Sequence, residues 1–233
     1  MSDQFIRTES IIGSEALKRL ASSRVAVFGL GGVGGAVAEA LARAGVGTLD
    51  LVDSDRISES NLNRQIIALH SKLGMLKTDA FEERIKDINP LCKVNKYELF
   101  YGEESADAID LAAFDFIADC IDSVSSKLFL IERAKRLGVP IVSSMGAGNK
   151  LDPSAFEAAD IYESSVDPLA RLIRRECKKR DIESLRVVYS KEAPIKPLRD
   201  SSGHELPVGS SPFAPPAAGL LVAYEVVRGL IGN

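Results

Sequence analysis

A glycine-rich segment follows a short apolar run near the beginning of the chain. The run Arg24–Leu30 is rich in β-branched and small residues, and the segment GLGGVG over Gly29–Gly34 has the spacing G-x-G-x-x-G. Glycine is required where a backbone turns tightly and approaches a phosphate, and the N–H groups that open the next helix attract the anion. Because a helix is predicted for 34–45, the spacing favours a nucleotide site over an ordinary tight turn. The glycines that would form it are Gly29, Gly31, Gly32 and Gly34.

A carboxylate follows at a distance that suits a ribose. Asp53 ends a second predicted strand, Thr48–Asp53, and lies 19 residues after Gly34. A carboxylate at this point accepts hydrogen bonds from ribose hydroxyls in dinucleotide-binding folds. These features alone fit a dehydrogenase that uses NAD as well as an enzyme that uses ATP.

The stretch after Asp53 favours a triphosphate over a dinucleotide. It is dense in polar side chains up to Gln65, and Lys77 then opens a helix predicted for Lys77–Asn89. A triphosphate carries more charge than a dinucleotide and needs cationic donors beyond the glycine turn. Taken singly, each cation could equally be a solvated surface charge, so the grouping is what indicates a site. The candidate nucleotide-binding side chains are Asp53, Asp55, Asn61, Arg64 and Lys77.

Asp122 stands just after a fourth predicted strand, Phe114–Cys120. Ligands of open α/β sheets bind beyond the carboxyl ends of the strands, so this side chain is expected beside the nucleotide. A carboxylate there could hold Mg²⁺ on phosphates, and the simpler alternative is a cap of the following helix. Asp122 is therefore the candidate metal ligand.

The elements that must position these residues alternate between strand and helix. Strands are predicted for the ranges 24–30, 48–53, 93–99, 114–120 and 139–144, with helices between them. This alternation indicates an α/β fold with a Rossmann-like, doubly wound and mostly parallel sheet. The length of 233 residues suits a single domain of this class.

The chain after residue 150 is predicted to extend the same sheet with C-terminal strands. A helix is predicted for Asp167–Arg180, with Asp167 as its N-cap and Pro168 as its first residue. Further predicted elements are strands at 155–162 and 186–192, a flexible loop rich in Pro, Gly and Ser at 193–218, and a terminal helix at 217–231. We divide the chain into an N-terminal helical segment (1–23), a nucleotide-binding core (24–150) and a substrate and dimer extension (151–233).

Composition and termini favour a cytoplasmic protein. The segment MSDQFIRTES has no apolar signal core. The apolar stretch Ala217–Ile231 contains Glu225 and Arg228 and is too short to span a bilayer, so no membrane association is expected. No cysteine pair has CxxC spacing, so the sequence predicts neither a zinc knuckle nor a thioredoxin-type motif. The cysteines are Cys92, Cys120 and Cys177, and we expect packing roles for Cys120 and Cys177.

Four short segments and one lysine, taken in order along the chain, resemble the adenylation core of the ThiF/MoeB/HesA proteins of the ubiquitin-activating superfamily. They are GLGGVG, VDSD, SNLNRQ, Lys77 and DCID. Nearly the whole chain is also similar to one subfamily, the tRNA threonylcarbamoyladenosine dehydratases. The stretches that carry this similarity are FIRTESIIG (5–13), NRQIIALHS (63–71), RIKDINP (84–90), SSMGAGNKLDP (143–153), DPLARLIRRE (167–176), VVYSKEAP (187–194) and PFAPPAAGLLVAYEVVRGLI (212–231).

The resemblance implies roles for individual residues. Gly31 would lie in the nucleotide loop, Asp53 on the ribose, and Asp122 beside magnesium. Arg7 would reach the phosphates in the site of the other subunit of a homodimer. The residues implied to contact the ATP phosphates are Asn61, Arg64 and Lys77. The implied catalytic set is Arg7, Arg64, Lys77 and Asp122.

The resemblance also implies an activity. In this subfamily, an ATP-dependent, ligase-type enzyme converts the carboxylate of N6-threonylcarbamoyladenosine, next to the tRNA anticodon, to an acyl-adenylate. The threonyl unit then closes into a ring, and AMP leaves. The resemblance leaves open a monovalent cation near Met145–Lys150, and cysteine-desulfurase or sulfur-acceptor proteins as partners.

A basic stripe is the best sequence signal for a tRNA partner. The net charge of −4 means that any nucleic-acid site must be a local basic patch. Four cations of the predicted helix Asp167–Arg180 fall at the spacing i, i+3, i+4, i+7, and a solvated face is an equal alternative. These tRNA-binding candidates are Arg171, Arg174, Arg175 and Lys178.

Three other functions compete with tRNA modification. The main alternative is adenylation of the C-terminus of a ubiquitin-like or sulfur-carrier protein, which the missing zinc cysteines disfavour. A dehydrogenase that uses NAD is disfavoured by the cations Arg64 and Lys77. A non-catalytic nucleotide-binding module would bind ATP without forming AMP.

Overall fold

Strands and helices alternate along the chain as the sequence pattern predicts. The strands are β1 (Arg24–Phe28), β2 (Thr48–Val52), β3 (Lys93–Tyr97), β4 (Phe116–Asp119), β5 (Ile141–Ser144), β6 (Phe156–Asp160) and β7 (Arg186–Ser190). The α-helices are α1 (Ile6–Ile12), α2 (Ser14–Ser22), α3 (Gly32–Ala44), α4 (Lys77–Ile88), α5 (Val124–Leu137), α6 (Pro168–Lys179) and α7 (Ala214–Ile231). Short 3₁₀ helices cover Asp3–Phe5, Glu59–Asn61, His70–Lys72, Glu103–Ala108, Leu111–Ala113 and Pro153–Ala155.

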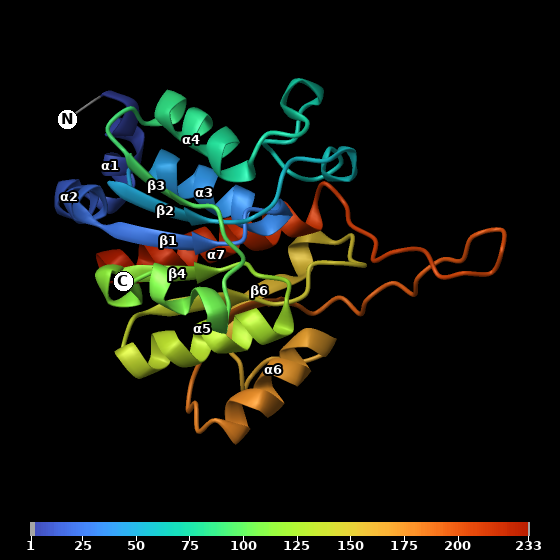
Figure 1. The fold of residues 1–233 in the computed structure, drawn as a ribbon. Coiled ribbons are helices and arrows are strands. Elements are labelled where there is room, and N and C mark those ends of the chain that lie inside the picture. The colour runs from blue at the N-terminus through green and yellow to red at the C-terminus, as the bar shows by residue number, and fades with distance from the viewer. Residues whose placement is uncertain (1–2, 233) are drawn as a thin grey trace.

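The strands form one sheet in the order β3-β2-β1-β4-β5-β7-β6. A computed structural model describes residues 3–232 (Figure 1). Neighbouring strands are parallel, except that β6 runs antiparallel to β7 at one edge. The predicted doubly wound, mostly parallel α/β fold, extended by C-terminal strands in one domain, is therefore confirmed.

Helices on both faces of the sheet enclose two apolar cores. Val25 and Val27 of β1 face the core shared with α3 and α7, whereas Ala26 and Phe28 face the core shared with α5 and α6. This division arises because successive side chains of a strand point to opposite faces. In Figure 1, α3 and α4 lie on one side of the sheet, and α5 and α6 lie on the other.

The boundaries of two predicted helices are wrong by a few residues. The helix predicted from residue 34 begins at Gly32, so the last two glycines of the motif lie in its first turn. The loop predicted for 193–218 ends at residue 213, because α7 already begins at Ala214. Pro215 and Pro216 suggested a loop, but proline is tolerated in a first helical turn, where the missing N–H has no partner to lose. Asp167 caps α6 as predicted and accepts a hydrogen bond from the Ala170 N–H at 2.9 Å.

Helix α7 packs one face against α3 and the sheet, and its other face exposes Leu220 and Tyr224. Its 18 residues are long and apolar enough to cross a membrane by length and composition. The expectation that this stretch is too short to span a bilayer was based on only 15 of them, Ala217–Ile231, and is wrong on length. However, a Cβ on Gly219 would lie 2.3 Å from the Val33 carbonyl oxygen, which shows how closely α7 approaches α3. Glu225 is buried and accepts a hydrogen bond from Arg186 Nε at 2.7 Å, which joins α7 to β7. These contacts fix one face of α7 within the fold, with 44% of the helix buried.

A buried ion pair fixes the carboxyl ends of two central strands. Lys127 of α5 is fully buried, and its Nζ lies 2.8 Å from Asp119 Oδ2 and 3.3 Å from Ser143 Oγ. A buried ammonium requires such partners, because an unpaired charge in the interior is very costly. Lys127 therefore holds the ends of β4 and β5 together at the edge where the functional side chains follow.

The close approach at the glycine turn generates a prediction for Gly34→Ala. A Cβ at residue 34 would lie 1.7 Å from the Gly29 carbonyl oxygen, so the turn and α3 would have to separate. We expect a loss of about 3 kcal/mol in the free energy of unfolding, measured by urea denaturation, because overpacking of this kind distorts the backbone. The control is Gly102→Ala, where the nearest atom lies 3.9 Å away. A wild-type urea midpoint for Gly34→Ala would contradict this expectation.

Candidate functional site

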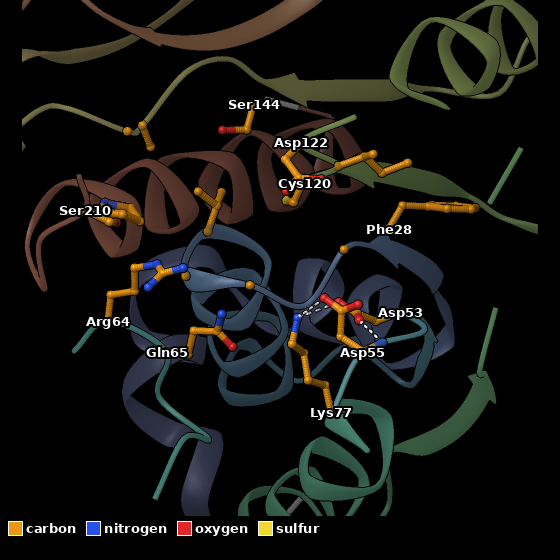
Figure 2. Close-up of a pocket in the computed structure, with 18 of the residues that line it drawn as sticks. Phe28, Asp53, Asp55, Arg64, Gln65, Lys77, Cys120, Asp122, Ser144 and Ser210 are labelled. Carbon is orange, nitrogen blue, oxygen red and sulfur yellow. Dashed lines mark hydrogen bonds and ion pairs between the residues drawn. The ribbon is translucent and has the colours of Figure 1, made fainter. Parts of the chain in front are cut away.

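The main cavity lies at the carboxyl ends of the central strands. It has a volume of about 530 Å³ and opens beyond β1, β2, β4 and β5. In Figure 2, Arg64, Gln65 and Lys77 lie on one side of this cavity, and Cys120, Asp122 and Ser144 lie on the other. The lining residues used below are Gly29, Gly31, Gly32, Asp53, Asp55, Asn61, Arg64, Gln65, Lys77, Cys120, Asp122, Ser144–Gly148, Leu169 and Val208–Ser210.

The glycine turn joins β1 to the start of α3. Gly29 has φ +84°, a left-handed conformation that favours glycine, and a Cβ there would lie 2.7 Å from the Cys120 carbonyl oxygen. Gly31 caps α3 without any side-chain hydrogen bond to the free N–H groups of the first turn. Those N–H groups and the positive end of the helix dipole are suited to a phosphate.

Asp53 connects the glycine turn to the next loop. Its Oδ2 accepts a hydrogen bond from the Leu30 N–H at 2.6 Å, and its Oδ1 accepts one from the Asp55 N–H at 2.8 Å. Lys77 Nζ lies 2.7 Å from Asp55 Oδ2 and 3.5 Å from Asp53 Oδ2 (Figure 2). The Lys77 side chain is buried, so these carboxylates hold its ammonium in place at the head of α4.

Arg64 contributes a cation that no carboxylate neutralises within residues 3–232. Its Nη1 donates to the Ser60 carbonyl at 2.7 Å and to Asn63 Oδ1 at 2.9 Å. Both acceptors are neutral, so the guanidinium is oriented while its charge remains available. Asn61 belongs to the same loop and accepts a hydrogen bond from the Ser58 N–H at 3.1 Å. The structure thus brings together the predicted residues Asn61, Arg64 and Lys77 around one cavity.

Gln65 is a site residue that was not among the predicted ones. Its side-chain oxygen is buried and has no hydrogen-bond partner in the described part of the chain, although the residue lines the cavity. The amide nitrogen of Gln65 is the atom turned toward the cavity (Figure 2), and it lies 4.0 Å from where a Cβ on Gly31 would be, so this N–H₂ group is the part of the side chain that can donate to a ligand. The position next to Arg64 was the available signal, but a neutral amide does not stand out in a polar segment.

Asp122 lies in the loop between β4 and α5, and its side chain is exposed at the cavity. Ser123, rather than Asp122, is the N-cap residue of α5, so the alternative role as a helix cap is not supported. No group of three or more His, Cys, Asp or Glu residues suited to a metal occurs within residues 3–232. The single carboxylate of Asp122 still suits Mg²⁺, because an Mg²⁺ ion held mainly by phosphate oxygens needs only one or two protein carboxylates.

The cysteines lack the character of nucleophiles. Burial and the neighbouring carboxylate of Asp119 raise the pKa of Cys120 well above its ordinary value. Burial also raises the pKa of Cys92 and of Cys177 to about 11. Since the thiolate is the reactive form, these thiols remain protonated at neutral pH.

Lys150 places an ammonium beside the loop that follows β5. Its Nζ donates to the Gly146 carbonyl at 2.7 Å and also forms a buried ion pair with Asp167. The protein thus supplies its own positive charge within the segment 145–150. A separate monovalent cation near this segment stays a prediction.

Arg7 lies far from the cavity of its own chain. Helix α1 follows Phe5, which packs at the C-terminal end of α3 against Gly45, and Gln4 donates to the Ile88 carbonyl at 3.1 Å. The cavity is at the N-terminal end of α3, about 20 Å away along a helix of 13 residues. Arg7 is therefore not brought together with the other predicted site residues.

The predicted basic stripe on α6 is only partly exposed. Arg174 is half-buried, because its Nη1 donates to the Ser164 carbonyl at 2.7 Å and to Ser164 Oγ at 2.9 Å. The exposed cations are Arg171, Arg175 and Lys178. The helix begins at the cavity, since Leu169 lines it.

The fold and the cavity are those of a nucleotide-binding α/β protein, with a glycine turn, the carboxylate of Asp53 and the cations of Arg64 and Lys77 at the carboxyl ends of the strands. The chain belongs to the ThiF family, whose model matches residues 4–233.

Relatives with this fold are similar over most of the chain. The tRNA threonylcarbamoyladenosine dehydratase of Bacillus subtilis (strain 168) is 40% identical over 243 residues, covering 99% of this chain and 96% of that protein. The enzyme of the same name from Escherichia coli (strain K12) is 35% identical over 207 residues, covering 85% and 77%.

Solved structures agree with this relationship. The crystal structure of the E. coli tRNA N6-threonylcarbamoyladenosine dehydratase TcdA in complex with AMP has a TM-score of 0.90 and 31% identity, covering 99% of this chain and 96% of that one. Its complex with ATP has a TM-score of 0.88 and 30% identity, with the same coverage.

Proposed function

We propose that this protein uses ATP to dehydrate N6-threonylcarbamoyladenosine next to the anticodon of tRNA, through adenylation of the carboxylate. The observation that carries the proposal is the grouping of Arg64, Lys77 and Asn61 around the phosphate turn, in a cavity that also exposes Asp122. The close relatives with the dehydratase name support the choice of substrate.

The chemistry needs a better leaving group than hydroxide. The substrate carboxylate oxygen forms a bond to the α-phosphorus of ATP, and the bond from that phosphorus to the pyrophosphate oxygen breaks. A nucleophile within the same threonylcarbamoyl group then attacks the activated carbonyl, AMP leaves, and one proton is released. The ring closure is intramolecular, so held geometry can supply on the order of 7–11 kcal/mol of the barrier.

Each residue has a separate task in this scheme. The turn at Gly29–Gly34 would bind the α-phosphate, and Asp53 would accept from the ribose hydroxyls. Arg64 and Lys77 would offset the charge that accumulates as pyrophosphate departs. Asp122 would hold Mg²⁺, which supplies further charge neutralisation on the phosphates.

The function is tested by incubating the pure protein with ATP and tRNA that carries threonylcarbamoyladenosine. We expect AMP, pyrophosphate and loss of one water from the modified nucleoside, measured by mass spectrometry of digested tRNA. Lys77→Ala should lower the rate by about 10²–10³, as expected for the loss of one preorganised charge. Lys86→Ala is the control, because Lys86 lies on α4 but pairs with Glu82 at the surface.

Two outcomes would contradict the proposal. One is pyrophosphate exchange that depends on a ubiquitin-like protein ending in Gly-Gly while modified tRNA has no effect. The other is tighter binding of NAD than of ATP, together with unchanged cofactor affinity in Arg64→Ala.

The exposed cations of α6 are proposed as a contact with the tRNA backbone. Support comes from the geometry, since α6 begins at the cavity and Arg171, Arg175 and Lys178 continue away from it. For Arg171→Glu with Arg175→Glu, we expect weaker tRNA binding. The slope of log K against log salt should flatten by about 1.4, because two contacts to single-stranded phosphates are lost. The control is Lys135→Glu with Arg136→Glu at the end of α5, which makes the same change in charge. Equal salt slopes for the two variants would show that the cations of α6 are solvated and do not contact tRNA.

A homodimer in which Arg7 acts on the partner's site is proposed as the active form. The distance of Arg7 from its own cavity supports action in trans. In a mixture of Arg7→Ala and Lys77→Ala subunits, mixed dimers hold one intact site, so we expect about a quarter of wild-type activity. A mixture of Lys77→Ala and Asp122→Ala is the control, since every site then has one defect. Activity no higher than that of the separate variants would exclude action in trans.

A further inference from the structure

The segment between β7 and α7 forms a long hairpin that leaves the body of the molecule and returns to the cavity. Its arms, within residues 195–208, extend well beyond the sheet, and Arg199 and Glu205 bridge them near the tip (Figure 1). The returning end, Val208–Ser210, is part of the cavity wall. This end and the start at Ile195 are here called the hairpin root.

One residue binds both arms at the root. The Asn149 N–H donates to the Gly209 carbonyl at 2.8 Å, and the Asn149 carbonyl accepts from the Ile195 N–H at 2.7 Å. The Asn149 side chain adds a third hydrogen bond, in which Oδ1 accepts from the Gly209 N–H at 2.6 Å. Asn149 has φ +55°, a left-handed conformation in which asparagine is among the most favourable residues after glycine.

Two neighbouring contacts extend this arrangement across the cavity. A Cβ on Gly148 would lie 2.6 Å from Val208 Cγ1, so the glycine leaves the room that the root occupies. On the other side, Asn63 Nδ2 donates to the Ser210 carbonyl at 3.0 Å, next to Arg64 in sequence. The root therefore spans from the loop after β5 to the loop that carries the phosphate-binding cations.

The half of the cavity bounded by the root suits the incoming carboxylate. The cations Arg64 and Lys77 would attract the outer phosphates, and in-line attack on the α-phosphorus must come from the side opposite pyrophosphate. The loop after β5 lies across the cavity from these cations (Figure 2). Among residues 3–232, the N–H groups of Gly146, Ala147 and Gly148 have no protein acceptor, and such groups are donors that suit a carboxylate.

We propose that Asn149 is a positioning residue that fixes the hairpin root as the wall of the subsite for the substrate carboxylate. This inference rests on the proposed adenylation of a carboxylate on RNA. Asn149 acts through Val208–Ser210 and does not line the cavity itself. Substitution of Asn149 should therefore change the reaction with the RNA substrate and leave the affinity for ATP unchanged.

Substitutions at Asn149 separate its side chain from its backbone conformation. Asn149→Gly keeps the left-handed φ and deletes the Oδ1 acceptor, whereas Asn149→Asp keeps an oxygen in the same place. We expect Asn149→Gly to lower kcat/KM for modified tRNA roughly tenfold, as for one lost hydrogen bond at a wall. The Kd for ATP should not change, and Asn149→Asp should restore the tRNA-dependent rate. Asp181→Gly is the matched control, since Asp181 is also left-handed, at φ +52°, and does not line the cavity.

Hydrogen exchange of the peptide that contains Gly209 gives a readout independent of activity. Faster exchange in Asn149→Gly than in wild type, with wild-type exchange in Asp181→Gly, is expected. Unchanged exchange would overturn the role of Asn149 at the root. Faster exchange with a wild-type kcat/KM for tRNA would overturn its role in the substrate subsite. If wild type releases no pyrophosphate with modified tRNA, the proposed function is wrong, and so is the role of Asn149 in a substrate subsite. The exchange rate still shows whether the Asn149 side chain holds Gly209.

Discussion

The carboxylate of Asp53 is the point on which the geometry of the site depends. It accepts N–H groups from the glycine turn after β1 and from the loop after β2, and it lies 3.5 Å from the ammonium of Lys77. Hydrogen bonds to an ionised acceptor are stronger than those between neutral groups, and a buried ammonium needs an anion nearby. One side chain thus sets the relative positions of two strand ends and the head of α4. The glycine turn can only have its observed shape because Gly34 brings no Cβ against Gly29.

The two cations at the cavity differ in how far protein carboxylates neutralise them. Lys77 is already paired with carboxylates, whereas Arg64 is held by neutral oxygens and keeps its full charge for a ligand. Asp122 exposes its carboxylate at the cavity from the other side. A polyphosphate with its metal complements this distribution better than a dinucleotide does, because Arg64 offers an unneutralised cation beyond the glycine turn and the Asp122 carboxylate suits a metal ion on the phosphates. With the thiols protonated, activation of the carboxylate as an acyl-adenylate is more consistent with the site than a covalent thioester intermediate.

The parts of the molecule governed by local chemistry were predictable from sequence. The glycine turn, the strand that precedes Asp53 and the cap at Asp167 each follow from the conformation or hydrogen bonding of residues close in the chain. Contacts between distant segments were not predictable. Lys127 looks like any helix cation in the sequence, yet it is fully buried against Asp119. Similarly, nothing near Asn149 indicates that it would bind residues 195 and 209, and Arg174 left the predicted stripe because Ser164 offers it two acceptors.

The cavity arises from the order of the strands and from the faces on which their connections lie. After β1 the chain turns to α3 on one face of the sheet, and after β4 it turns to α5 on the opposite face. The two connections diverge from neighbouring strands, so a crevice must open between them whatever side chains are present. Binding specificity can therefore be changed through the loops at the rim, including the root of the hairpin, without disturbing the two cores. The same backbone could accommodate a different acid while its nucleotide half remained intact.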